Sequence, residues 1–168
     1  MKNGVLHATG NDHVSERLWR QAFDLLCDGE QVLGHGMSRT VYGSKLLPDS
    51  VIKTEDVAQK FQNVIEWETW QRVVDTPLSR WFAECQWISS DGTVLIMERT
   101  RQPRADEFPL EVPHFLCDYK RKNYGMSTGK KGKQWFVCHD YGTLAFERSM
   151  ASTALKRLHK VAWEDLEH

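Results

Sequence analysis

The stretch from Gln31 to Lys53 breaks into short pieces rich in β-branched residues, and these pieces are separated by Gly, Pro and Ser. Three strands are expected there, at Gln31–Leu33, Thr40–Tyr42 and Val51–Lys53. Residues 56–74 contain neither Gly nor Pro and predict one long helix, which ends shortly before Pro77. A sheet followed at once by a helix already constrains the chain to a mixed α and β architecture.

The rest of the chain predicts a first helix, two strands joined by a turn at Ser90-Asp91-Gly92, an irregular connector, a hairpin and a last helix. Their expected bounds are Ser15–Cys27, Glu84–Ile88, Thr93–Glu98, 101–113, Asn123–Met126 with Gln134–Cys138, and Ser149–Trp163. The last helix is inferred from an apolar stripe formed by Ala154, Leu155, Leu158 and Val161. This order of elements is α+β, and no internal repeat is visible.

Charge and hydropathy exclude several classes of protein. The 168 residues carry a net charge of −1, which provides no overall field for nucleic acid or an anionic membrane. No apolar run approaches the roughly 18 residues of a membrane span, and no signal peptide is recognised at the start. We expect a globular, cytoplasmic protein whose residues 166–168 are the remainder of a purification tag.

The four cysteines are scattered, which favours a reducing compartment over a disulfide scaffold. His114, Cys117, Cys138 and His139 offer a set of zinc ligands. Adjacent Cys and His rarely both reach one ion, however, so buried free thiols beside ordinary histidines are the preferred interpretation.

Two features near the predicted sheet indicate phosphate chemistry. Gly34-His35-Gly36 lies between two strands, where glycine lets backbone amides approach a phosphate, although an ordinary turn explains it equally well. Lys53 ends a buried strand, and its ammonium group needs an anionic partner there. The following helix offers Glu66 or Glu68 as this partner. The apolar stripe of that helix runs through Glu68, whereas the spacing to later apolar residues favours Glu66, so the choice stays open.

Oxygen ligands follow later in the chain. Asp118-Tyr119-Lys120-Arg121-Lys122-Asn123 leads into a strand, and Asp140-Tyr141-Gly142 follows the next strand. Carboxylate and amide oxygens at strand ends suit the coordination of Mg²⁺ together with phosphate.

The order of these motifs resembles the signature set of the protein kinases. The motifs are Gly34-x-Gly36-x-x-Arg39-x-Val41, Lys53, a helical glutamate, Asp118-x-Lys120-x-x-Asn123 and Asp140-x-Gly142. The stretch from Leu33-Gly34-His35-Gly36 to Val51-Ile52-Lys53 is similar to the early serine/threonine protein kinases of T7-like bacteriophages. The resemblance covers residues 33–142, about two thirds of the chain.

The resemblance implies a role for each matching residue. Gly34 and Gly36 would cover the phosphates of ATP, and Val41 would pack on the adenine. Lys53, held by Glu66 or Glu68, would bind the α- and β-phosphates. Asp118 would orient the attacking hydroxyl, Lys120 would steady the γ-phosphate, and Asn123 and Asp140 would hold Mg²⁺.

The chain departs from the kinase pattern in several places. Arg39 replaces the third glycine, Leu116-Cys117 stands where His-Arg is usual, and Tyr141 replaces a phenylalanine. The segment between Glu98 and Asp118 is too short for a long helix, and no Ala-Pro-Glu follows Gly142. The expectation is therefore a minimal protein-kinase-like fold with a helical segment at 1–30, a β-rich N-lobe at 31–100 that carries one helix, and a strongly truncated C-lobe at 101–165.

Two other features have simpler explanations. The basic clusters Lys120-Arg121-Lys122 and Lys130-Lys131-x-Lys133 could contact nucleic acid or an acidic partner, but lysine-rich turns are usually solvated. The tryptophans are more typical of core packing than of a recognition cage. They are Trp67, Trp70, Trp81 and Trp87.

Three functions are compatible with this pattern. The first is transfer of the γ-phosphate of Mg-ATP to Ser or Thr of a protein, either a target in the bacterial host cytoplasm or the chain itself. The second is a pseudokinase that binds and inhibits a host protein without phosphotransfer. The third is transfer to a small molecule, or nucleotidyl transfer.

Overall fold

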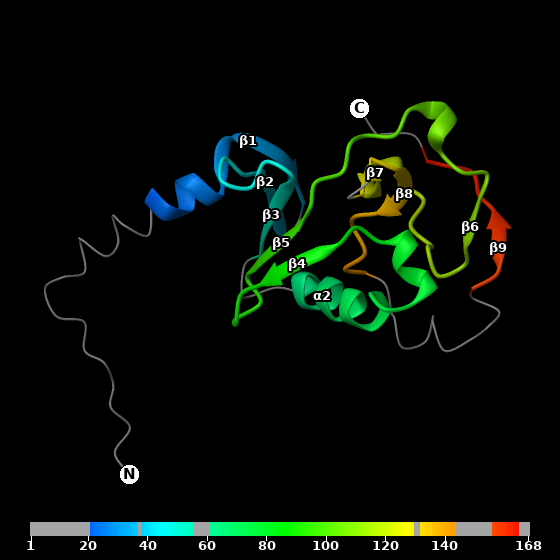
Figure 1. Cartoon of the computed structure of the whole chain (residues 1–168), viewed down its shortest axis with the longest axis horizontal. Helices are drawn as coiled ribbons and strands as arrows, with labels where there is room; N and C mark the ends of the chain where they lie inside the picture. Colours follow the sequence, from blue (N-terminus) through cyan, green and yellow to red (C-terminus); the bar gives the residue numbers. More distant parts are fainter. Residues whose placement is uncertain (1–20, 37, 56–60, 130–131, 144–155, 165–168) are drawn as a thin grey trace, which may run out of the picture.

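The computed structural model describes residues 21–36, 38–55, 61–129, 132–143 and 156–164. Within these ranges the fold is mixed α+β, with three antiparallel sheets, the helix α2 and a further helical stretch at residues 21–26 (Figure 1). The strands and the helix are β1 (Asp28–His35), β2 (Arg39–Gly43), β3 (Ser50–Glu55), α2 (Gln62–Val73), β4 (Cys85–Ile88), β5 (Val94–Glu98), β6 (Glu111–Pro113), β7 (Tyr124–Thr128), β8 (Gln134–Cys138) and β9 (Leu158–Lys160). Three 3-10 turns complete the elements: η1 (Pro77–Trp81), η2 (Ala105–Glu107) and η3 (Arg121–Asn123).

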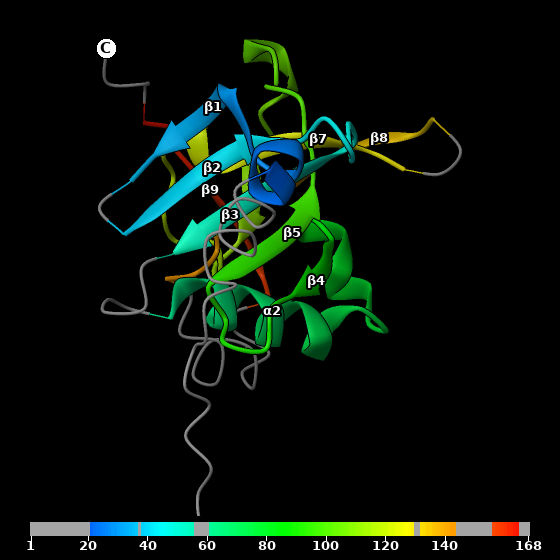
Figure 2. The same cartoon turned by 90° about the vertical axis from the view of Figure 1, so that its left-hand side faces the viewer.

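The first five strands form one antiparallel sheet in the order β1-β2-β3-β5-β4 (Figure 2). β3 is central, and Lys53 in this strand pairs with Val41 of β2 on one side and Leu95 of β5 on the other. β4 and β5 are joined by a tight turn in which Gly92 has a φ of +76°, a conformation that glycine adopts at little cost. The sheet therefore holds Lys53 at its middle, with neighbours on both sides.

Two side chains fix the start of α2 against this sheet. The carboxylate of Glu55, at the end of β3, accepts hydrogen bonds from the backbone N–H groups of Gln62 and Asn63, both at 2.9 Å. These N–H groups belong to the first turn of the helix, which has no partner for them within the helix itself. The fully buried Asn63 donates from its side-chain amide to the carbonyl oxygens of Lys53, Gly92 and Thr93. The orientation of α2 relative to β3 is thus set by polar contacts at the N-terminus of the helix.

The second half of the chain forms two smaller sheets beside the first sheet (Figure 1). β7 pairs with β8, and β6 pairs with β9. One apolar core runs from α2 and β4 into these sheets, and Trp163 packs against its edge through contacts with Phe108, Tyr124 and Phe136. The buried residues of this core include Val73, Phe82, Leu95, Met97, Val112, Phe115, Leu116, Val137 and Tyr141.

Most of the elements expected from the sequence are confirmed. The five strands of the first sheet, the turn at Gly92 and the β7–β8 hairpin lie where their patterns predicted them. The helix expected at residues 56–74 is α2, with residues 56–60 outside the described ranges. Of the first helix, residues 21–26 are helical and Ser15 lies outside the described ranges.

The last predicted helix is wrong where the structure describes it. Residues 158–160 form β9, which pairs with β6, and residues 161–163 are not helical. Of the apolar stripe that predicted a helix, Leu158 is 54% exposed and Val161 packs against the core, while Ala154 and Leu155 lie outside the described ranges. The connector at 101–113 is also more ordered than expected, because it contains η2 and β6. Pairing between two segments far apart in sequence has overridden the local helical pattern of the second segment.

No helix within the described ranges is long and apolar enough to cross a membrane. Residues 1–20 of the predicted helical segment at 1–30 lie outside those ranges, and so does the predicted tag remainder at 166–168.

Candidate functional site

A cleft of about 560 Å³ opens between the first sheet and the segments that flank β7 and β8. The sheet contributes the turn between β1 and β2, together with apolar side chains on β2, β3 and β5. The opposite wall comes from the ends of η3 and β8. The lining residues include Gly34, Gly36, Arg39, Val41, Val51, Lys53, Met97, Thr100, Lys122, Asn123, His139 and Asp140.

Glu66 is the centre of the polar contacts behind this cleft. Its side chain is fully buried, and its Oε2 lies 2.8 Å from Nζ of Lys53. Its other oxygen accepts hydrogen bonds from the backbone N–H groups of Tyr141 at 3.1 Å and Gly142 at 3.2 Å. One carboxylate on α2 therefore links the central strand of the sheet to the loop that carries Asp140.

A second cation, Arg39 of β2, enters the same cluster. Its guanidinium group lies 2.9 Å from Oε2 of Glu66 and 2.5 Å from Oδ1 of Asp140. The Arg39 side chain is 7% exposed. Burial by itself would raise the pKa of Asp140, but the positive charges of Lys53 and Arg39 outweigh it and hold that pKa below its usual value. Two cations and two carboxylates thus balance one another at the base of the cleft.

His139 orders the loop before Asp140. Its Nε2 lies 2.8 Å from the carbonyl oxygen of Lys122, which can only accept, so this nitrogen carries the proton. Its Nδ1 then accepts from the hydroxyl of Thr100 at 2.7 Å. Burial, and next the charge of Lys53, lower the pKa of His139, which favours the neutral ring, in which Nδ1 is the acceptor. The ammonium group of Lys53 also donates to the carbonyl oxygen of His139.

Two glycines allow these segments to approach one another. A Cβ at Gly125 would lie 2.1 Å from Oγ1 of Thr100 and 3.0 Å from Nδ1 of His139. A Cβ at Gly142 would lie 2.9 Å from Cβ of Gln62 on α2. Larger side chains at either position would push the loop away from the sheet or from the helix.

The structure brings together most of the predicted site residues, but not all of them. Those that line the cleft are Gly34, Gly36, Val41, Lys53, Asn123 and Asp140. Glu66 pairs with Lys53, whereas Glu68 is exposed and lies 4.0 Å from Arg72 on its own helix. Asp118 and Lys120 do not line the cleft, and their side chains are half-exposed and 3.8 Å apart.

Two metal predictions concern residues of this part of the chain. Among the described residues, no group of three or more His, Cys, Asp and Glu side chains could hold a metal ion, and these residues include His114, Cys117, Cys138 and His139. That finding contradicts the zinc alternative, and all four cysteines are free. Asp140 and Asn123 are adjacent, because the N–H group of Asp140 donates to the carbonyl oxygen of Asn123 at 3.3 Å. One carboxylate and one amide fit Mg²⁺ as a partial ligand set, which phosphate oxygens would complete.

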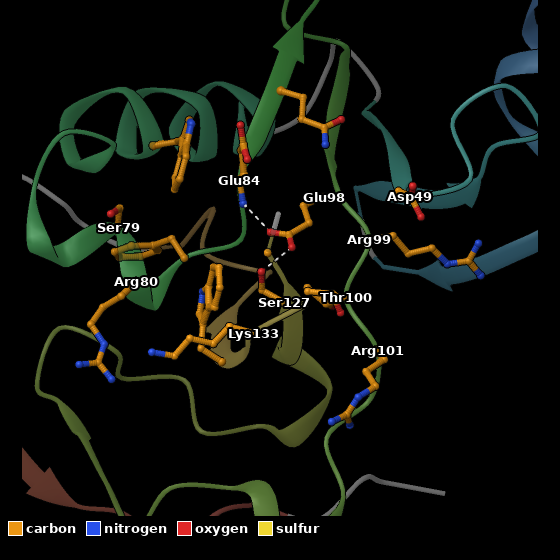
Figure 3. A pocket seen from close by; sticks show the side chains of 16 residues that line it. Asp49, Ser79, Arg80, Glu84, Glu98, Arg99, Thr100, Arg101, Ser127 and Lys133 are labelled. Atoms are coloured by element: carbon orange, nitrogen blue, oxygen red, sulfur yellow. Dashed lines mark hydrogen bonds between the residues drawn. The ribbon is translucent and has the colours of Figure 1, made fainter. Parts of the chain in front are cut away.

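A larger hollow of about 1370 Å³ lies between β4, η1 and the β7–β8 hairpin (Figure 3). Its centre is polar: Glu98 accepts hydrogen bonds from the hydroxyl of Ser127 and from the N–H group of Glu84. In Figure 3, Arg80 and Lys133 lie at one end of the hollow. Because the hollow is lined by three acidic residues and four basic ones, its lining shows no preference for a ligand of one charge.

Sequence patterns do not predict several residues that line the cleft or support it from behind. Arg39 stood out only as a replacement for glycine, and the contributions of His139, Thr100, Glu55 and Asn63 went unrecognised. The position of His139 directly before Asp140 was the one available signal. No protein-family model matches the chain, and a search of curated proteins finds no match either.

Proposed function

We propose that the chain is a reduced protein-kinase-like phosphotransferase that binds Mg-ATP and transfers its γ-phosphate to Ser or Thr of a protein. The observation that carries this proposal is the double contact of Glu66 with Lys53 and with the backbone of Tyr141 and Gly142. That contact ties a buried lysine of a β-sheet to the loop that carries Asp140, and Lys53 and Asp140 line the same cleft. Phosphoryl transfer requires such a fixed arrangement of cation and metal ligand.

The cleft offers suitable surfaces for the parts of a nucleotide. Val41, Val51 and Met97 give it apolar walls, against which a flat purine can pack. Gly34 and Gly36 border it without side chains, so phosphate oxygens can come close to their backbone. Lys53 supplies a positive charge for the phosphates, and Glu66 keeps its ammonium group in place.

Asn123 and Asp140 are the residues that would hold Mg²⁺ in this proposal. When bound, the ion supplies positive charge that offsets the charge developing on the transferring phosphoryl group. Two protein ligands make a weak site, so the phosphates of the nucleotide are needed to complete it.

The phosphoacceptor side of the proposal relies on Asp118 and Lys120. The backbone of Glu164 holds their loop in place. Its carbonyl oxygen accepts a hydrogen bond from the N–H group of Arg121, and its N–H group donates to the carbonyl oxygen of Tyr119. Half-exposed side chains at this position are accessible to a protein substrate. Likeness to phage kinases favours a target in the bacterial cytoplasm or the chain itself.

Two observations favour a second function, that of a pseudokinase acting as an interaction module on a host protein. Asp140 is already paired with Arg39, and Asp118 does not line the cleft. A chain that only binds a partner needs neither residue to be available for chemistry.

Incubation with γ-labelled ATP and Mg²⁺, alone and with bacterial lysate, tests the proposal. Label on Ser or Thr that is lost in Lys53→Met and Asp140→Asn, but kept in Lys45→Met, supports phosphotransfer at this site. Lys45 is a suitable control because its exposed ammonium group pairs with Asp28 at 3.4 Å, away from the cleft. Absence of label in the wild type would refute phosphotransfer. Label that is equal in all four proteins would refute the residue assignment.

A further inference from the structure

Arg39 occupies an unusual position for a residue beside a glycine turn. It begins β2, and its carbonyl oxygen accepts from the N–H group of Gly36 at 2.8 Å, so it closes the turn between β1 and β2. Its side chain is directed inward, reaching Asp140 across 101 positions of sequence. A buried arginine needs anionic partners, and Glu66 and Asp140 are these partners.

The two carboxylates differ in how much they depend on Arg39. Glu66 is also held by Lys53 and by two backbone N–H groups. Asp140 forms its ion pair with Arg39. The side chain of Asp140 is 46% exposed, and it lines the cleft. Removal of Arg39 therefore leaves Glu66 satisfied but leaves the carboxylate of Asp140 without the guanidinium group that it contacts.

The geometry points to Arg39 as a resident counter-ion that occupies Asp140 until a metal-bound nucleotide takes its place. This inference rests on the function proposed above and adds a form of regulation to it. While Arg39 is paired, the carboxylate is poorly available to a free divalent cation. When Arg39 leaves Asp140, its guanidinium group keeps Glu66 but loses its second anion, and the phosphates of a nucleotide bound in the cleft that Arg39 lines would replace it.

The consequence is a thermodynamic coupling between two ligands. Arg39 lowers the affinity of Asp140 for a free divalent cation. On leaving Asp140 the guanidinium group keeps Glu66, and it recovers a second ionic partner only when a nucleotide is present. Metal and nucleotide should therefore bind together far better than either binds alone. Arg39 in this role is a positioning and selecting residue that favours the metal–nucleotide complex over the free metal.

Binding of Mn²⁺ to the nucleotide-free protein, followed by electron paramagnetic resonance, tests the inference without any catalytic readout. The variants are Arg39→Gln, the double variant Arg39→Gln/Asp140→Asn, and Arg99→Ala as a matched control. Arg99 lines the same cleft and is exposed, and its guanidinium group bonds to Gln31 at 3.5 Å. Its removal takes one positive charge from the cleft while leaving the pair of Arg39 and Asp140 intact. Thermal unfolding of each variant establishes that it is folded before the titration.

We expect Arg39→Gln to bind Mn²⁺ at least about tenfold more tightly than the wild type, which corresponds to about 1.4 kcal/mol. The gain should disappear in the double variant and should be absent in Arg99→Ala. Equal affinity in wild type and Arg39→Gln would overturn the inference, as would an equal gain in Arg99→Ala. These readings do not depend on nucleotide binding. If the wild type bound no ATP but Arg39→Gln gained Mn²⁺ affinity, the proposed function would fail while the counter-ion role of Arg39 at Asp140 stood.

Discussion

The ammonium group of Lys53 lies 2.8 Å from the carboxylate of Glu66, and both side chains are almost entirely buried. Each charge would be costly in this position without the other, because water is excluded from both. The pair also determines geometry, since Glu66 uses its second oxygen to hold the backbone of Tyr141 and Gly142. One ion pair therefore connects the sheet, the helix and the loop that carries Asp140.

Replacement of Glu66 by glutamine should destabilise the fold strongly. Lys53 and Arg39 would then share a buried space without their common carboxylate, which is expected to cost about 3–5 kcal/mol in the free energy of unfolding. Glu68→Gln is the matched control two positions away, since its exposed pair with Arg72 at 4.0 Å is worth about 0–1 kcal/mol. Urea unfolding measures both variants, and similar losses in the two would contradict the role of Glu66.

Gly125→Ala should also destabilise the protein. The added Cβ would lie 2.1 Å from Oγ1 of Thr100, which is hydrogen-bonded to His139, so the loop before Asp140 must shift. Overpacking of this kind costs about 1–3 kcal/mol. Gly29→Ala is the control, because no atom lies within 4 Å of a Cβ at that position. Thermal unfolding should show a lower midpoint for Gly125→Ala alone, and an unchanged midpoint would show that the contact relaxes without cost.

Stability should fall in mildly acidic solution because of His139. Burial, and then the charge of Lys53, lower the pKa of this ring in the folded protein. The unfolded chain therefore takes up the proton at a higher pH than the folded chain does. The contribution of His139 to the free energy of unfolding is complete above the pKa of the unfolded chain, about 6.5. It is lost as the pH falls through the lower pKa of the folded protein.

The measurement is the free energy of unfolding between about pH 8 and about pH 5 for wild type and His139→Gln. Glutamine does not titrate in this range, so the pH dependence of the variant should be weaker than that of the wild type. Parallel curves for the two proteins would contradict the assignment to His139.

The cysteines should differ sharply in reactivity. Burial raises the pKa of Cys27 to about 11 and that of Cys85 to about 12, and it raises the pKa of Cys138 well above its ordinary value. Cys117 is exposed. Because the thiolate is the reactive form, a disulfide reagent should modify Cys117 rapidly and the three buried thiols only after denaturation. Cys117→Ser should abolish the rapid phase, and a rapid phase that persists would show that a buried thiol is accessible.

The elements that the sequence predicted well are those with strong local patterns. Val51-Ile52 before Lys53 marked β3, and the absence of Gly and Pro marked α2. The helix predicted up to Trp163 is wrong for residues 158–160 because their apolar spacing suits a helix although they form a strand. Their partner strand β6 lies more than forty residues earlier, so no local sequence pattern indicates the pairing.

The candidate site shows the same division. Lys53, Asp140 and the glycines could be found because each belongs to a short motif. The choice between Glu66 and Glu68 required the rotation of α2, which Glu55 and Asn63 determine through contacts with backbone groups. Arg39 meets Asp140 only through the folded sheet, so no spacing in the sequence could have predicted that pair.

Calorimetric titration of Mg-ATP into the wild type, Lys53→Met and Lys45→Met measures whether the cleft beside Lys53 binds a metal-bound nucleotide. We predict saturable binding at one site in the wild type and in Lys45→Met, and an affinity at least about tenfold lower in Lys53→Met. Absence of binding to the folded wild type, or equal affinity in all three proteins, would contradict the claim that this cleft takes a metal-bound nucleotide.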